Sequence, residues 1–388
     1  MSIGWRTRII HSPVSAPPGF RSLATPTYRG STTLFENSAS VTDDWDQTRA
    51  RYSYGLYGTP TTFELAARIA DLEGGRHCFI TPGGQAAIAL IYLSFARAGG
   101  HVLLPDSVYG PSRELAERLL ARLGIEAEYY DPLIGPGIRS LLRKNTQLIW
   151  CESPGSVTME VQDIPAICAA ARTANVPVAL DNTYAAGVLF DAFKHGVDVT
   201  MQALTKYVGG HSDLLLGSVT VRDAAHYQLI GDAHQLLGMG VSPDDCSLAL
   251  RGLQTLAVRL AQHESSALLV ARWLGAQPLI DRVLHPALES CPGHQSWARD
   301  FTGSASVFSV VFSPGVPRQA IEEFVDRLEL FEIGYSWGGV TSLAMPFFAL
   351  RRRERPANGN LVRFNVGLED PQDLIADLNR SLSKIQDF

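Results

Sequence analysis

Two apolar segments in the middle of the chain each end beside a side chain that could take part in catalysis. The run VPVAL is followed by Asp181, and the run VDVTMQAL ends just before Thr205 and Lys206. Runs as apolar as these are typical of strands that are buried on both faces of a parallel sheet. Ligands of such sheets bind beyond the carboxyl ends of the strands. We therefore expect the carboxyl of Asp181 and the amine of Lys206 to face one crevice.

An acid and an amine at one crevice have two interpretations. The simpler one is a buried ion pair, and either residue taken alone is usually a solvated loop residue. The other is a site for pyridoxal phosphate, in which the lysine amine binds the cofactor aldehyde covalently and the carboxylate keeps the ring nitrogen protonated. Small and polar residues follow both side chains: Asn182 and Thr183 after Asp181, and GGHSD downstream of Lys206. They leave room for a cofactor and favour the second interpretation.

A glycine-rich turn, PGGQ, lies between a predicted strand, HCFIT, and a strongly apolar predicted helix, AAIALIYLSFARAG. Backbone N–H groups at the start of a helix are ready ligands for a phosphate, although Gly83 and Gly84 could also serve only to make a tight turn. Further along, the predicted strand HVLLPD is followed by Tyr109, which on its own could be a packing residue. Beside Asp181 and Lys206, the glycine turn favours phosphate binding.

Six blocks of sequence, in this order, resemble the Cys/Met-metabolism family of pyridoxal-phosphate enzymes: DPLIG, ESPGSVTMEVQDIPAI, LDNTYAAGVLF, QALTKYVGGHSD, YSWGG and VRFNVGLED. The match runs from about Tyr52 to the C-terminus. The resemblance implies that Lys206 carries the cofactor, that Asp181 contacts the ring nitrogen and that Tyr109 stacks over the ring. It also implies that the phosphate is bound by Gly84, the amide of Gln85 and Thr205.

The same resemblance implies an amino acid substrate and a carbon–sulfur lyase. Arg363 occupies the position at which the family arginine binds the α-carboxylate of the substrate. Ser336 and Trp337 occupy positions whose residues border that carboxylate and the cofactor lysine in the family. The β-lyase-like blocks lead us to expect cleavage of L-cystathionine by β-elimination to homocysteine, pyruvate and ammonia, a transsulfuration step of methionine biosynthesis. Lys206 would then remove the α-proton, and Lys206 or Tyr109 would protonate the leaving sulfur.

Two alternatives stay open at this point. The first is a γ-eliminating lyase or a broad cysteine-S-conjugate lyase of the same family, because the same core residues serve all of these reactions. The second, from another class, is a catalytically silent scaffold that keeps the fold. The retention of Lys206, Asp181, Tyr109 and Arg363 argues against the silent scaffold.

One position departs from the family pattern, in which a Tyr-x-Arg pair from the adjacent subunit also reaches the phosphate. Counting back from GTPTTF, the tyrosine is Tyr54 and the arginine position holds Leu56; the register that pairs Tyr52 with Tyr54 lacks the arginine as well. Leucine cannot replace a guanidinium on a phosphate. We therefore expect Tyr54 to bind the phosphate, and Arg51, Arg49 or a water network to supply part of the missing charge.

Strands and helices alternate over roughly 150 residues, which predicts an α/β fold with a doubly wound, mostly parallel sheet. The resemblance specifies the aspartate-aminotransferase-like cofactor fold. A chain of 388 residues is too long for one core. We expect an N-terminal arm over residues 1–50, a cofactor-binding α/β domain over 51–245 and a smaller α+β domain over 246–388. The resemblance implies that the arm lies on a neighbouring subunit, in dimers that pair into a tetramer.

Composition excludes several other classes of protein. The net charge of −6 offers no basic patch for nucleic acid or an anionic membrane. The five cysteines are odd in number, widely spaced and without a CxxC pair, which argues for reduced thiols rather than disulfides or a metal site. No stretch reaches about 18 uninterrupted apolar residues, and the N-terminus lacks a signal-peptide core. We expect a cytoplasmic enzyme that acts on a small molecule.

Overall fold

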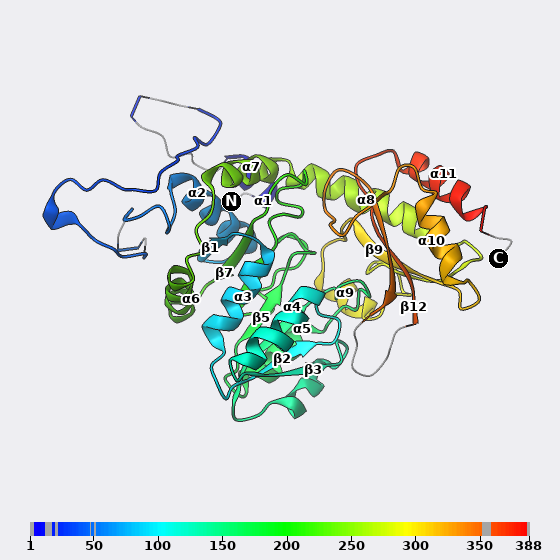
Figure 1. Cartoon of the computed structure of the whole chain (residues 1–388), viewed down its shortest axis with the longest axis horizontal. Coiled ribbons are helices and arrows are strands. Elements are labelled where there is room, and N and C mark those ends of the chain that lie inside the picture. Colours follow the sequence, from blue (N-terminus) through cyan, green and yellow to red (C-terminus); the bar gives the residue numbers. More distant parts are fainter. Residues whose placement is uncertain are drawn as a thin grey trace.

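The protein contains two β-sheets, each covered by helices, in two parts that lie side by side (Figure 1). The computed structural model describes residues 4–11, 18–19, 22–46, 48–49, 52–350 and 358–385. The larger sheet has seven strands and the smaller has five. The α/β class that the alternating pattern predicts is confirmed.

The seven-stranded sheet is mostly parallel, as expected. Its strands, in spatial order, are β1 (His77–Thr81), β7 (Gly217–Val221), β6 (Val199–Gln202), β5 (Val178–Asp181), β4 (Thr146–Glu152), β2 (His101–Pro105) and β3 (Glu126–Tyr130). The five strands from β6 to β3 are parallel, and β7 runs antiparallel to both of its neighbours. Every residue of β2, β6 and β7 is buried, which explains why these segments read as continuous apolar runs.

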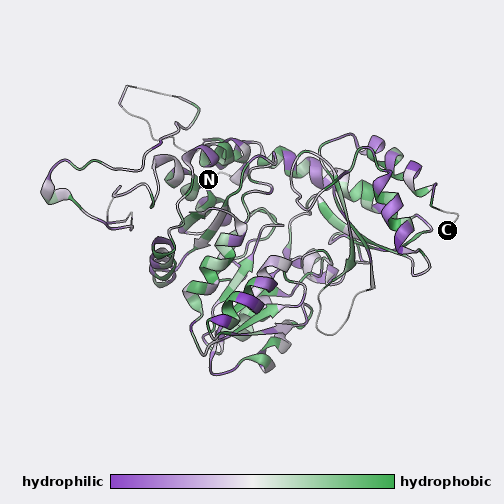
Figure 2. Cartoon of the chain, viewed as in Figure 1, coloured by the Kyte–Doolittle hydropathy of each residue, from purple (hydrophilic) through white to green (hydrophobic). Residues whose placement is uncertain are grey.

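Alternate side chains of this sheet enter two separate cores. In β4, Leu148 and Trp150 belong to one core while Ile149 and Cys151 belong to the other. The first core is covered by α3 (Gly84–Phe95) and α6 (Ala224–Leu236), and the second by α2 (Pro60–Glu73) and α5 (Ile164–Arg172). Figure 2 shows the resulting apolar centre, with the strands green and the outer helix faces purple. The sheet is therefore fixed on both faces, and only its strand ends are free to form a site.

The smaller sheet is mostly antiparallel and lies towards the C-terminus. Its spatial order is β10 (Glu332–Ile333), β11 (Leu343–Ala349), β12 (Asn358–Asn365), β9 (Val307–Phe312) and β8 (Ile280–Leu284). A third core, which includes Phe308, Phe324 and Phe364, joins it to helices α8 (Leu256–Gly275), α10 (Arg318–Asp326) and α11 (Pro371–Leu382). The other α-helices in the described part of the chain are α1 (Trp5–His11), α4 (Gly110–Glu114), α7 (Pro243–Gln254) and α9 (His294–Asp300).

The predicted limits of the domains stay predictions, and the boundary at 245/246 falls inside α7. Part of the predicted N-terminal arm is described, and Figure 1 shows it extending away from the body of the chain. This segment exposes apolar side chains, with Leu23 96% and Leu34 89% accessible. All five cysteines are free thiols. Among the residues described, no helix has the length and apolarity needed to cross a bilayer.

Candidate active site

A cavity of about 440 Å³ lies at the carboxyl ends of β4, β5 and β6, where the two sheets approach each other. The larger domain contributes strand ends and the start of α3, and the smaller domain contributes β9, β12 and the loop after β10. This is the position expected for a ligand of an open α/β sheet. The cavity is lined by eight of the ten residues to which the resemblance assigned a role: Gly84, Gln85, Tyr109, Asp181, Thr205, Lys206, Trp337 and Arg363. The other two, Ser336 and Tyr54, are not among its lining residues.

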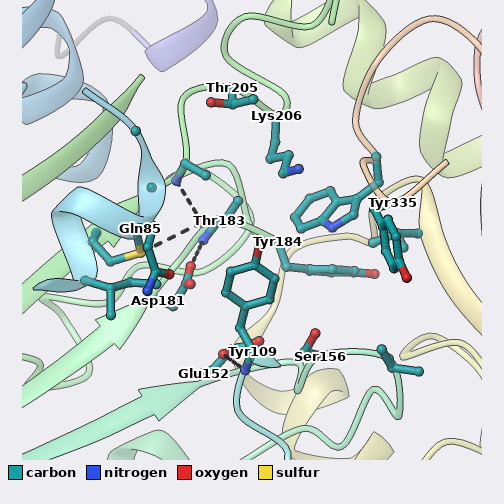
Figure 3. Close-up of a pocket in the computed structure, with 18 of the residues that line it drawn as sticks. Gln85, Tyr109, Glu152, Ser156, Asp181, Thr183, Tyr184, Thr205, Lys206 and Tyr335 are labelled. Carbon is teal, nitrogen blue, oxygen red and sulfur yellow. Dashed lines mark hydrogen bonds between the residues drawn. The ribbon is translucent and has the colours of Figure 1, made fainter. Parts of the chain in front are cut away.

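Lys206 extends into the cavity from the turn after β6 (Figure 3). Its Nζ lies 2.8 Å from the Oγ of Ser336 and 5.4 Å from the centre of the Trp337 ring. Both contacts come from the loop after β10, and they depend on Gly338: a Cβ there would lie within 3.3 Å of the Lys206 backbone and Cβ. Burial and the positive charge of Arg363 lower the pKa of Lys206 to about 8, while Asp181 acts in the opposite direction. The neutral amine is therefore accessible near neutral pH.

Asp181 ends β5 and faces the same cavity as Lys206, which is the juxtaposition predicted from the two strand ends. Burial raises the pKa of its carboxyl. The backbone N–H of Thr183 donates to Oδ1 at 3.0 Å, and this bond, together with the charge of Lys206, favours the ionised form. A carboxylate enclosed in this way is suited to bind a protonated ring nitrogen.

The start of α3 forms one end of the cavity. The first hydrogen bond of the helix runs from the N–H of Ala87 to the carbonyl of Gly83 (3.1 Å), so the N–H groups between them have no partner within the helix. Gly84 packs so closely on Ala203 that a Cβ would lie 2.8 Å from the Cβ of that residue. Thr205 lines the same cavity, with its Oγ1 bonded to the backbone of Leu216.

These features fit pyridoxal phosphate: unpaired amides at a helix N-terminus for the phosphate, an enclosed carboxylate for the ring nitrogen, and an amine for the aldehyde. Among the described residues that line the cavity, the cationic side chains are Lys206 and Arg363. Within the part of the chain that the structure describes, the donors at the phosphate end are therefore neutral.

Tyr109 directs its hydroxyl into the cavity, opposite the side from which Lys206 enters (Figure 3). Tyr109 as a whole is 43% exposed, so it stands at the mouth of the cavity. Its backbone N–H donates to Oε2 of Glu152 at 2.8 Å. Burial raises the pKa of the phenol, as do the nearby carboxyls of Glu152 and Asp181. The hydroxyl is thus held in its protonated form and can donate a proton.

Arg363 reaches the cavity from β12 in the smaller domain and is buried. Its Nη2 donates to the carbonyl of Tyr335, and its guanidinium lies 5.3 Å from the centre of the Phe347 ring. Burial lowers its pKa to about 10, so the side chain still carries its positive charge at neutral pH. A buried cation that faces a cavity is a suitable partner for a substrate carboxylate.

Residues 6–383 match the family model described as Cys/Met metabolism PLP-dependent enzyme. The chain belongs to this family. It is 44% identical over 364 residues to a putative cystathionine beta-lyase of Rhizobium johnstonii (92% of this chain, 90% of the relative). It is 43% identical over 341 residues to the cystathionine beta-lyase MetC of Escherichia coli K12 (86% of each).

Solved structures agree with this assignment. The structure of cystathionine gamma-lyase from Lactobacillus plantarum, complexed with L-serine, superimposes with a TM-score of 0.90 at 27% identity and covers 99% of this chain and 100% of that one. The expected family, fold and cofactor are therefore confirmed: the protein is a pyridoxal-phosphate-dependent enzyme of Cys/Met metabolism.

The segment around Tyr54 and Leu56 was expected to supply a tyrosine to the phosphate and to lack the arginine. Tyr54 is 47% exposed and is not among the residues that line the cavity of its own chain. Leu56 packs against Gly240. Arg49, one of the expected replacements, forms ion pairs with Asp44 (2.9 Å) and Asp46 (3.3 Å). The other, Arg51, lies outside the described residues.

Among the cavity residues to which the sequence analysis gave no role are Glu152, Ser156 and Tyr335. Glu152 could have been found, because it follows the apolar run TQLIWC in the same way that Asp181 follows VPVAL. Ser156 lies within the block ESPGSVTMEVQDIPAI and Tyr335 begins YSWGG, so both blocks contained more of the site than was assigned.

Proposed function

We propose that this enzyme cleaves L-cystathionine by β-elimination to homocysteine, pyruvate and ammonia. One observation carries the proposal: an amine of lowered pKa, a carboxyl and a buried guanidinium converge on one cavity in a chain that is over 40% identical to proteins named cystathionine beta-lyase. The step would serve methionine biosynthesis through transsulfuration.

Substrate binding is assigned to the smaller domain. Arg363 pairs with the α-carboxylate of the amino acid, and the Ser336 hydroxyl and Trp337 border the space between that carboxylate and Lys206. A second cavity of about 470 Å³ shares Tyr109, Ser156 and Arg363 with the first. It offers room for a long substituent on the β-carbon of the substrate.

Proton transfer is assigned to Lys206 and Tyr109. Pyridoxal phosphate, when bound, supplies an electron-poor ring that stabilises negative charge at the α-carbon of the attached amino acid. Lys206 removes the α-proton as a neutral amine, which its pKa of about 8 permits. The bond between the β-carbon and sulfur breaks with its electron pair on sulfur, and Lys206 or Tyr109 gives that sulfur a proton. The remaining three-carbon unit hydrolyses to pyruvate and ammonia.

The quaternary arrangement is part of the proposal. Tyr54 lies outside its own cavity, and the N-terminal segment exposes Leu23 and Leu34, so we assign both to contacts with a second copy of the chain in a tetramer built from two dimers. The enzyme is proposed to act in the cytoplasm. Light scattering coupled to gel filtration tests the assembly, and a monomer at micromolar concentration contradicts it.

The product of L-cystathionine cleavage tests the reaction. We expect pyruvate, measured with lactate dehydrogenase, and no pyruvate from Lys206→Ala. The formation of 2-oxobutyrate instead would assign γ-elimination, the activity named for the Lactobacillus structure. A lack of turnover on cystathionine, cystine and other thioether amino acids would favour the silent scaffold.

A further inference from the structure

Glu152 occupies a central place in the cavity without any of the roles assigned so far. It ends β4, the strand between β2 and β5, and its backbone is in register with Asp181 on the adjacent parallel strand. Both side chains line the cavity, and Glu152 is 8% exposed. Two carboxyls therefore lie side by side in the wall that faces Lys206 (Figure 3).

One oxygen of Glu152 holds the loop that carries Tyr109. The N–H of Tyr109 donates to Oε2 at 2.8 Å. A backbone bond from the N–H of Ser156 to the carbonyl of Ser107 (2.9 Å) joins the same two loops at a neighbouring point. The loop after β4 thus supports the loop after β2, and Glu152 fixes the point from which the tyrosine ring extends.

The two carboxyls have different surroundings. The Thr183 N–H and the charge of Lys206 favour the ionised form of Asp181. The Tyr109 N–H favours the ionised form of Glu152 in the same way, but the charge that acts on Glu152 is the like charge of Asp181. Burial, and then the charge of Asp181, raise the pKa of Glu152 well above its usual value. Because Lys206 favours the charge on Asp181 and the like charge of Asp181 disfavours a charge on Glu152, we assign the proton to Glu152 and the negative charge to Asp181.

We propose that Glu152 is a positioning residue of this enzyme, which holds the Tyr109 ring over the cofactor and presents a neutral carboxyl to Asp181. The proposal rests on the proposed use of this cavity for the cofactor and the amino acid. Glu152 acts through Tyr109 and Asp181 and takes no part itself in bond breaking.

Two substitutions separate the parts of this role. Glu152→Gln keeps the shape of the side chain, an acceptor for the Tyr109 N–H and a donor group, so it imitates the protonated carboxyl. Glu152→Ala removes the acceptor and leaves the Tyr109 N–H unpaired. Glu160→Gln is the matched control: it changes a buried glutamate on the same loop that contacts Thr158 and does not line the cavity.

The readouts are cofactor affinity, the pH midpoint of the absorbance change of the bound cofactor, and kcat for thioether cleavage. We expect Glu152→Gln and Glu160→Gln to stay within about threefold of the parent in affinity and to leave the midpoint unchanged. We expect Glu152→Ala to lose about tenfold or more in kcat, because the partly buried N–H of Tyr109 then lacks its acceptor and the placement of the ring is destabilised.

Two results would overturn the proposal. A shift of the midpoint by about one pH unit or more in Glu152→Gln would mean that Glu152 is ionised. Parental kcat in Glu152→Ala would mean that it does not position Tyr109. Because affinity and absorbance are measured without substrate, they report on Glu152 even if the parent makes no pyruvate, the result that would refute the proposed reaction instead. Circular dichroism of Glu152→Ala establishes that it folds, and the Glu152→Gln arm stands independently of it.

Discussion

The amine of Lys206 should capture the cofactor aldehyde at neutral pH far faster than an exposed lysine would, because only the neutral amine attacks. Lowering its pKa from 10.5 to about 8 raises the neutral fraction at pH 7 from about 1 in 3,000 to about 1 in 10, a gain of about 300-fold. The lowering comes first from burial and then from the charge of Arg363, so it is a property of the folded cavity without cofactor.

Stopped-flow absorbance of the apo-protein mixed with pyridoxal phosphate measures this directly. The observed rate should rise about tenfold between pH 7 and pH 9 and then level off, with a midpoint near pH 8. Lys206→Ala should lack the visible band of the covalent complex, whereas Lys194→Ala, which changes an exposed lysine, should retain it.

A second variant tests the cause of the low pKa. Removing the charge in Arg363→Gln should move the midpoint to higher pH, because a neighbouring cation disfavours the charged amine. The reasoning would be refuted by a rate that keeps rising tenfold per pH unit up to pH 10, since the amine would then have the pKa of an exposed lysine.

Three further changes test other parts of the site. Gly84→Ala should weaken cofactor binding about tenfold or more, because the new Cβ would lie 2.8 Å from the Cβ of Ala203. Equilibrium dialysis measures the affinity, and an unchanged value would contradict the close packing of Gly84 on Ala203. Leu56→Arg should strengthen cofactor binding, since the described residues at the phosphate end of the cavity lack a guanidinium. Arg51→Ala should weaken cofactor binding. If neither variant changes the affinity, the expected replacement of the missing arginine is wrong. Arg363→Lys should raise the KM for the amino acid about tenfold or more while the cofactor affinity stays constant, because an ammonium cannot make the paired hydrogen bonds of a guanidinium. An unchanged KM would show that Arg363 does not bind the substrate carboxylate.

The larger domain could be predicted well from its sequence. The meeting of Asp181 and Lys206 follows from two buried runs whose carboxyl ends lie at one edge of a parallel sheet, and the structure has that edge. The antiparallel position of β7 between β1 and β6 was not predicted. The segment GSVTV is as buried as a parallel strand, and an apolar run of this kind does not indicate the direction in which a strand pairs.

Contacts made between domains were beyond pattern reasoning. The bond between Lys206 and Ser336 joins residues 130 positions apart, and only the resemblance placed Ser336 and Arg363 near the cofactor. Glu152 was missed although its signal equals that of Asp181, because a single acid after a strand does not reveal that a second acid is its neighbour. The role of Tyr54 could not be tested in a single chain, because the phosphate that it is proposed to bind lies in the cavity of another copy.

The attachment point of the cofactor is the most direct test of the whole account. The purified holoenzyme is reduced with borohydride and digested, and the cofactor-bearing peptide is located by mass spectrometry. The account predicts a reduced cofactor on Lys206 and on no other lysine. A label on Lys144, Lys194 or Lys384, or no label in a protein that still makes pyruvate from cystathionine, would contradict it.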